Sequence, residues 1–157
     1  STLRIDVILR KPWVLIEKPS GIIFIDREGK IIEPSESPAH LIKVEGIDLG
    51  KDSVAENEIW KLDVLQKIER WYNYYNIQRY FKMDKITIIK PTEVILTNTE
   101  NMEKNRKIII TGDNTEEQFQ KIQIILEECG KTGKDFEYID ARFQNPAVKY
   151  RKQQTNE

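Results

Sequence analysis

Two stretches of helical periodicity interrupt a chain that otherwise alternates apolar and polar residues, and this pattern restricts the fold most. Apolar residues recur every three or four positions in residues 59–75 and again in residues 119–129. Other apolar segments, such as 3–7 and 84–90, are short and show the alternation typical of strands. The order is several strands, a helix, three strands, a helix and two strands. It predicts an α+β domain, with two main helices packed on a mostly antiparallel, mixed β-sheet.

Capping signals predict the limits of both helices. Ser53, with Glu56 three residues later, fits a capping box, so the first helix is expected to start there. Asn114 with Glu117 can cap the second helix, and Gly130 is expected to end it. The expected buried faces carry Ile59, Leu62, Leu65, Ile68, Tyr72 and Tyr75 in the first helix and Phe119, Ile122, Ile125, Leu126 and Cys129 in the second.

Turn residues divide the rest of the chain into strands. Pro12 separates a first strand from a second that begins at Trp13. Residues 26–29 provide the turn of a hairpin, and residues 41–44 form a short strand. Residues 84–112 predict a three-stranded antiparallel meander.

The segment FEYIDARFQNPAVKY, residues 136–150, predicts a final hairpin. If its last strand, Ala147–Tyr150, lies at a sheet edge, its unpaired N–H and C=O groups can accept a strand from another protein. Pro146 and Lys149 are also residue types that protect an edge, so the local pattern leaves docking edge and guarded edge open. Alternation predicts that Phe143 and Val148 point to one face and Ala147 and Lys149 to the other.

The residue inventory argues against catalysis and nucleic-acid binding. The 25 Lys and Arg residues against 26 Asp and Glu give a net charge of −1, without the basic excess that phosphate binding requires. His40 is the one histidine and lies in an expected loop, and Cys129 is the one cysteine and lies on an apolar helix face. Neither has the partners of a catalytic pair or a metal site. We therefore expect no enzymatic activity, no cofactor and no metal.

Residues 71–81, WYNYYNIQRYF, hold six aromatic side chains. As an exposed flat platform, Trp71, Tyr74 and Tyr80 could stack on sugars or bases. The competing interpretation is that most of these rings continue the buried helix face or pack beneath the next strand. This second interpretation is the more usual one for aromatics at helical spacing.

Four segments together resemble the extracytoplasmic part of the FtsQ/DivIB family of bacterial cell-division proteins. STLRIDVILRKPW, residues 1–13, is similar to the end of a POTRA module and its exit into the next domain. IIFIDREGKII at 22–32 resembles a family hairpin, and RKIIITGDNTEEQFQKIQIIL at 106–126 resembles a strand–glycine–helix segment. YIDARFQNPAVKY at 138–150 resembles the terminal hairpin, although Ala141 stands where the family has leucine.

The resemblance implies an organisation and a function. Residues 1–12 would end a POTRA-like module, residues 13–150 would form an FtsQ/DivIB-like β domain, and residues 151–157 read as a disordered polar tail. The whole protein would be a single-pass inner-membrane protein, anchored by an N-terminal helix absent from this chain, with this part outside the cytoplasm. It would be a non-catalytic divisome scaffold whose last strand binds FtsB/FtsL-type partners. The docking residues implied are Tyr138, Arg142, Phe143, Ala147, Val148, Lys149 and Tyr150.

Two other functions stay open at this point. One is a cell-wall glycan-binding module that uses the aromatics of residues 71–81. The other is a POTRA-linked module from a secretion or assembly system.

Overall fold

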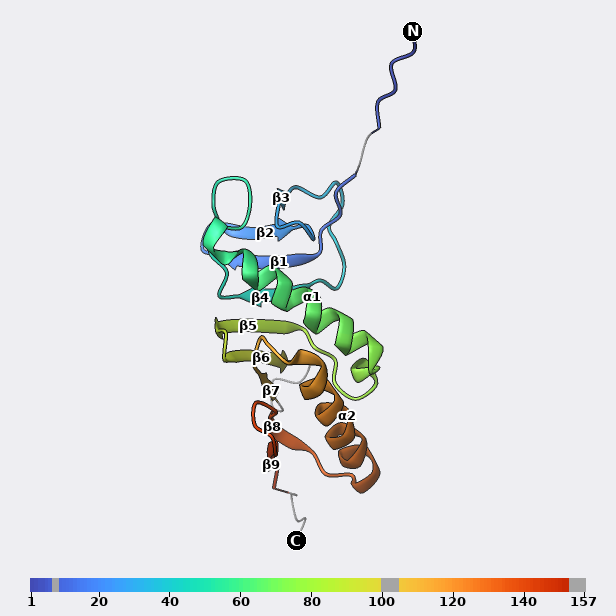
Figure 1. The fold of residues 1–157 in the computed structure, drawn as a ribbon, viewed down its shortest axis with the longest axis vertical. Helices are drawn as coiled ribbons and strands as arrows, with labels where there is room; N and C mark the ends of the chain where they lie inside the picture. Colours follow the sequence, from blue (N-terminus) through green and yellow to red (C-terminus); the bar gives the residue numbers. More distant parts are fainter. Residues whose placement is uncertain (7–8, 100–104, 153–157) are drawn as a thin grey trace.

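The computed structural model describes residues 1–6, 9–99 and 105–152, and its centre is a nine-stranded sheet with both long helices on one face (Figure 1). This arrangement confirms the expected α+β class. The strands are β1 (Val14–Lys18), β2 (Gly21–Ile25), β3 (Ile31–Ile32), β4 (Ile42–Glu45), β5 (Lys85–Lys90), β6 (Glu93–Asn98), β7 (Arg106–Ile110), β8 (Phe136–Asp140) and β9 (Ala147–Tyr150). The helices are α1 (Ile59–Tyr74) and α2 (Thr115–Thr132), with short 3-10 helices η1 (Glu56–Glu58) and η2 (Ile77–Arg79) on either side of α1.

The sheet runs in the order β3-β2-β1-β4-β5-β6-β7-β8-β9. The pairs β1–β4, β4–β5 and β7–β8 are parallel, and the other neighbouring pairs are antiparallel. Parallel neighbours need a crossover connection, and α1 and α2 provide it for β4–β5 and β7–β8. Both crossovers advance in the same direction between strands of the same polarity. The usual right-handed connection therefore puts both helices on one face.

The core lies between the two helices and this face of the sheet. Alternate positions of the central strands are buried, as a sheet covered on one side requires. Each fully buried Leu, Ile or Phe stabilises the fold by roughly 1.5–3 kcal/mol relative to an exposed one. The helices contribute Leu62, Leu65, Ile68, Tyr72, Phe119, Ile122, Leu126 and Cys129, and the expected strand meander contributes Ile86, Ile88, Val94, Leu96, Ile108 and Ile110.

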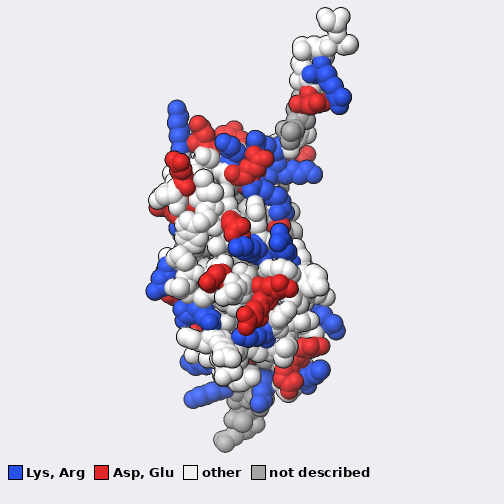
Figure 2. Space-filling view, viewed as in Figure 1, with Lys and Arg blue, Asp and Glu red and all other residues white. Residues whose placement is uncertain are grey.

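The opposite face of the sheet carries no helix from the described parts of the chain and holds both polar and apolar side chains, among the latter Ile95 and Ile109. The strand register aligns Lys43, Lys85, Thr97 and Lys107 in one row across four strands. Figure 2 shows the other side, where the helices lie, and there Lys and Arg alternate with Asp and Glu without a large field of one sign. This mixture agrees with the net charge of −1.

The start of α1 differs from the capping-box prediction. Ser53 pairs with Lys30 in an isolated bridge, and its carbonyl accepts the N–H of Gly50 at 2.7 Å. The backbone around Ser53 is therefore used to extend the edge of β3, and α1 begins only at Ile59. Glu56 lies in the 3-10 turn that precedes the helix. The expected helix start at Ser53 is wrong for this reason.

The end of α2 also differs from the prediction. Gly130 lies inside the helix, which continues to Thr132 and is followed by Gly133 at φ +67°. The ring of Tyr80 packs 3.5 Å from where a β-carbon of Gly130 would stand. This is ordinary van der Waals contact with room for a β-carbon, and Gly133 supplies the left-handed residue that ends the helix. At the other end, Asn114 is the N-cap residue as expected, but without a capping side-chain hydrogen bond.

Both chain ends differ from the prediction: the expected first strand is absent from residues 3–6, and the first residue of the expected tail is bound to the domain. Residues 3–6 are exposed and not in a strand, because no described strand pairs with them; residues 7–8 of the expected strand lie outside the described residues. At the other end, the Arg151 N–H donates to the Asp135 carbonyl at 2.9 Å. Of the tail expected to be disordered, Arg151 and Lys152 are described and 153–157 are not.

Candidate functional site

The two edges of the sheet are not equivalent. At the β3 edge, residues 52–54 run alongside the strand: the Ile31 N–H donates to the Asp52 carbonyl at 3.0 Å, and the Val54 N–H to the Gly29 carbonyl at 2.8 Å. At the other edge, β9 pairs with β8 and with no further strand of the described chain. An uncovered edge presents a row of unpaired backbone donors and acceptors. This makes β9 the candidate docking site.

The hydrogen bonds around β9 show which of its backbone groups face outward. The Ala141 N–H donates to the Ile109 carbonyl on β7, and the Arg151 N–H donates to the Asp135 carbonyl before β8. Because N–H groups alternate in direction along a strand, Ala147 and Lys149 direct theirs toward β8. Val148 and Tyr150 therefore direct their N–H and C=O groups away from the sheet.

An ion pair holds one end of the β8–β9 hairpin. Asp140 is only 8% exposed, and its carboxylate accepts from the guanidinium of Arg142 at 3.0 and 2.8 Å and from the Arg142 backbone N–H at 3.2 Å. Burial opposes ionisation of Asp140, yet the hydrogen bonds from Arg142 hold the pKa of Asp140 below its usual value. Arg142 also reaches the Thr92 carbonyl at 3.4 Å. Its charge therefore serves mainly to fix the hairpin.

Charges also hold the other end of the hairpin. The guanidinium of Arg151 lies 3.2 Å from the carboxylate of Asp135, which also lies 3.9 Å from Arg106. Arg151 donates in addition to the carbonyl of Asn105, just before β7. The residue that follows β9 is thus tied to the segments that precede β7 and β8. Strand β9 is fixed at both ends, while its outer side pairs with no other segment among the described residues.

A β-bulge between Phe136 and Tyr138 shapes the middle of the site. It lets Phe136 and Ile139, three residues apart, both face the core. On the open face, Lys149 pairs with Glu137 at 3.0 Å, beside Tyr138. The bulge therefore keeps the hairpin packed on the core while polar and aromatic groups line the open face.

Exposed aromatic side chains surround the free edge. Tyr138, Phe143 and Tyr150 are 38%, 58% and 45% exposed. The Lys134 ammonium lies 5.4 Å from the Tyr150 ring centroid, and the Arg142 guanidinium lies 5.6 Å from that of Phe143. Exposed tyrosine, phenylalanine and arginine side chains are typical of protein-binding surfaces.

The structure brings together most of the residues that the sequence suggested. Ala147, Val148, Lys149 and Tyr150 form β9, and Tyr138 pairs with Lys149 across the hairpin. Strand β8 ends at Asp140, so Phe143 lies in the loop that connects β8 to β9. The expectation that Phe143 shares a strand face with Val148 is therefore wrong. Val148 instead packs against the core, opposite Ile139.

Five residues of the site were missed by sequence reasoning: Lys134, Asp135, Glu137, Asp140 and Arg151. The spacing of Phe136 and Ile139 was the available signal for the bulge, because a regular strand would not bury both. Nothing in the sequence distinguished Arg151 from the polar tail that follows it.

The aromatic stretch does not form a flat platform. Tyr74 is exposed, but Trp71 and Tyr80 are half-buried and Tyr72 is buried. The rings of Trp71 and Tyr74 meet edge to face, at 82° with centroids 5.6 Å apart. The Tyr72 hydroxyl donates to the Phe81 carbonyl at 2.7 Å inside the core. These residues chiefly hold the end of α1 against the sheet and α2.

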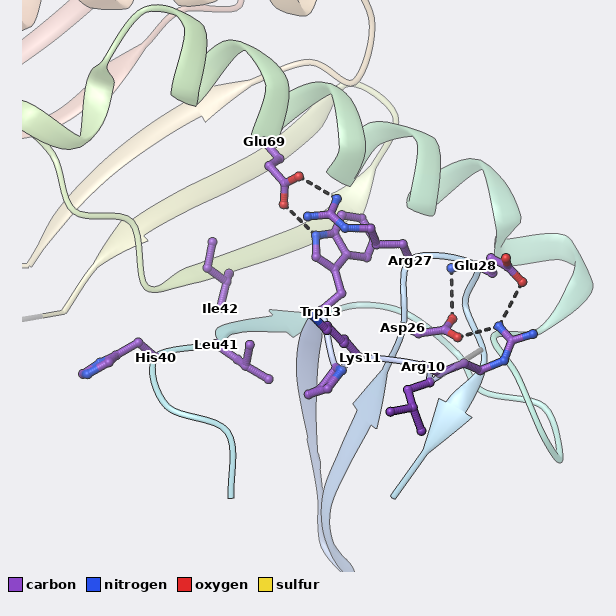
Figure 3. A pocket seen from close by; sticks show the side chains of 12 residues that line it. Arg10, Lys11, Trp13, Asp26, Arg27, Glu28, His40, Leu41, Ile42 and Glu69 are labelled. Atoms are coloured by element: carbon purple, nitrogen blue, oxygen red, sulfur yellow. Dashed lines mark hydrogen bonds and ion pairs between the residues drawn. The ribbon is translucent and has the colours of Figure 1, made fainter. Parts of the chain in front are cut away.

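Cys129 and His40, the one cysteine and the one histidine, lie in separate elements, on α2 and in the loop before β4. Cys129 is buried, and burial raises the pKa of its thiol, so it is a poor nucleophile. His40 lies in a loop beside the cavity drawn in Figure 3. Within the described residues no three His, Cys, Asp or Glu side chains come together as metal ligands. Neither of the described helices has the length and apolar character needed to cross a bilayer.

Comparisons with protein-family models and with curated proteins found no match to this chain. Its relation to the FtsQ/DivIB family therefore stays a prediction from the four segments.

Proposed function

We propose that this chain is a non-catalytic scaffold domain that binds a protein partner by adding a partner strand to β9. The observation that carries the proposal is a strand fixed at both ends whose outer side is unpaired within the described part of the chain. The Asp140–Arg142 pair and the Asp135–Arg151 pair order this strand before any partner arrives. Ordering it in advance lowers the entropy cost of binding.

The resemblance to the FtsQ/DivIB family supports a role in bacterial cell division. On that basis the partner is an FtsB/FtsL-type protein of the divisome. The full protein would be anchored in the inner membrane, with this domain on the extracytoplasmic side. Backbone hydrogen bonds to Val148 and Tyr150 would supply affinity, and the side chains of Tyr138, Phe143 and Tyr150 would supply specificity.

An NMR titration tests the proposal directly. The ¹⁵N-labelled protein is titrated with a peptide that spans the extracytoplasmic segment of an FtsB-like protein from the same organism. We expect shifts concentrated in residues 138–150. Val148→Pro removes an outward donor and is expected to abolish binding, whereas Val148→Ala keeps that donor and is expected to bind.

Tyr150→Ala is expected to abolish or strongly weaken binding, because it removes an exposed aromatic contact at the edge. If the parent, Val148→Pro and Tyr150→Ala bind the peptide with equal affinity, the proposal that β9 is the docking strand is wrong. An absence of shifts in a folded parent protein would sink the division role with this partner.

A further inference from the structure

Residues 9–13 lead into β1 and are held by contacts with elements far away in the sequence. The first contact is made by Arg10, whose Nη1 lies 2.7 Å from Oδ2 of Asp26 and 2.9 Å from Oε2 of Glu28 (Figure 3). Both carboxylates belong to the turn between β2 and β3. Arg10 is therefore bound to the body of the domain, although it precedes the first described strand.

Asp26 is a preformed acceptor for Arg10. It is 5% exposed, and its Oδ1 accepts the backbone N–H groups of Glu28 and Lys30, each at 2.9 Å. These two bonds hold the carboxylate in place without help from Arg10. Burial works against the charge, but the hydrogen bonds from Arg10 and the backbone keep the pKa of Asp26 below its usual value.

The second contact is made by Trp13, three residues later. Its indole Nε1 donates to Oε2 of Glu69 on α1 at 2.6 Å, and the other oxygen of Glu69 accepts from Arg27 at 2.6 Å. The guanidinium of Arg27 also lies 5.2 Å from the Trp13 ring centroid. The backbone N–H of Trp13 donates to the carbonyl of Ile25 at 2.8 Å. The position of Trp13 is thus fixed from both sides.

Between these two contacts the chain has little freedom. Pro12 has a fixed φ near −65°. Leu9 is 83% exposed and so packs little on the domain. When Arg10 is bound to Asp26, the backbone of residues 10–13 is held at both ends. When that bond is open, rotation at Arg10 and Lys11 can redirect everything that precedes them.

We propose that Arg10 and Asp26 form a latch that fixes the direction in which the chain before residue 10 leaves the domain. The latch joins the incoming chain to the β2–β3 turn, at the edge of the sheet opposite β9 (Figure 1). It orients the preceding segment relative to the sheet, and so relative to β9. This inference is independent of what β9 binds.

Electron–electron distance measurements test the latch. Nitroxides are placed at Leu9→Cys and at Arg70→Cys, an exposed position on α1, in a Cys129→Ala background. The parent is expected to show a narrow distance distribution. Arg10→Gln is expected to broaden it at least twofold, and Lys11→Gln is the matched control because it removes one positive charge at the adjacent position. Lys11, like Arg10, lines the cavity drawn in Figure 3, but it has no acidic partner among the described residues.

Asp26→Asn provides the reciprocal test. The amide oxygen can still accept from the turn backbone, while the amide nitrogen faces Arg10 and cannot accept its proton. We expect the same broadening as in Arg10→Gln, with thermal unfolding measured on every labelled variant to show that it is folded. A parent distribution as broad as that of Arg10→Gln overturns the latch. Equal broadening by Lys11→Gln also overturns it.

Discussion

Ile139 and Val148 lie opposite each other in the last hairpin as a pair whose backbone N–H groups point in opposite directions. The Ile139 N–H is directed toward β7, and that of Val148 is directed away from the sheet. The next residue, Lys149, directs its N–H back toward β8. Adjacent residues of β9 therefore differ in what their N–H groups contribute to folding.

Proline substitutions at Val148 and Lys149 measure that difference. Val148→Pro removes no internal ladder bond and is expected to lower the free energy of unfolding by less than about 1 kcal/mol. Lys149→Pro removes a bond to β8, and we expect a loss of about 2–3 kcal/mol from the missing donor and the distorted strand. Urea denaturation of both variants gives the two free energies of unfolding to be compared. A larger loss for Val148→Pro would reverse the assignment of the outward groups.

Asp140→Asn is expected to lower stability most at neutral pH. The folded-state pKa of Asp140 is depressed, so the stability from its charge is fully present above the unfolded pKa of about 3.9. That stability is lost as pH falls through the lower folded-state pKa. Hydrogen bonds to a charged group contribute about 1.5–3 kcal/mol, and we expect a loss of this size at pH 7.

The pH dependence of the difference identifies the cause of that loss. Unfolding free energies of parent and Asp140→Asn are measured from pH 7 down to pH 3. The gap between them should shrink below about pH 4, because the Asp140 carboxylate of the unfolded parent takes up protons there while that of the folded parent is still ionised. A gap that stays constant over this range would mean that the charge of Asp140 contributes nothing.

Most of the fold could be predicted from the periodic segments of the sequence. Both helices, the meander of β5–β7 and the final hairpin follow from apolar spacing, because the side chains of these elements face a single core. The helix limits did not follow: the backbone of Ser53 pairs with Lys30, a contact distant in sequence, and α2 continues past Gly130 to the left-handed Gly133. Such contacts leave no trace in a local pattern.

The candidate site was predicted in part for the same reason. The edge strand Ala147–Tyr150 is visible as a short alternating segment at the end of the domain. The ion pair of Arg142 with Asp140, two residues away, was not predicted. The role of Arg151 depends on Asp135 and Asn105, which only the folded sheet brings near.

Alanine substitutions at Gly46 and Gly130 should change the free energy of unfolding in opposite directions. Gly46 has φ +90°, and a β-carbon there would lie 2.0 Å from the carbonyl oxygen of Ile88. Gly46→Ala is therefore expected to cost more than about 2 kcal/mol. Gly130 lies in α2 with ordinary contact to Tyr80, so Gly130→Ala should gain roughly 0.5–1 kcal/mol from helix propensity. Thermal melts of the two variants, side by side, would show opposite shifts.

Arg151→Ala is expected to loosen the end of β9 without unfolding the domain. Arg151 joins Asp135 and Asn105, whereas the adjacent Lys152 is exposed and has no ion pair within the described chain. Loss of the Arg151 contacts should raise amide hydrogen exchange at Lys149 and Arg151 about tenfold, which corresponds to about 1.4 kcal/mol of local opening. Lys152→Ala removes the same charge one residue away and should leave both rates unchanged. Equal rates in the two variants would show that the side chain of Arg151 does not order the strand, and β9 would then owe its position to the β8 ladder and the Asp140–Arg142 pair alone.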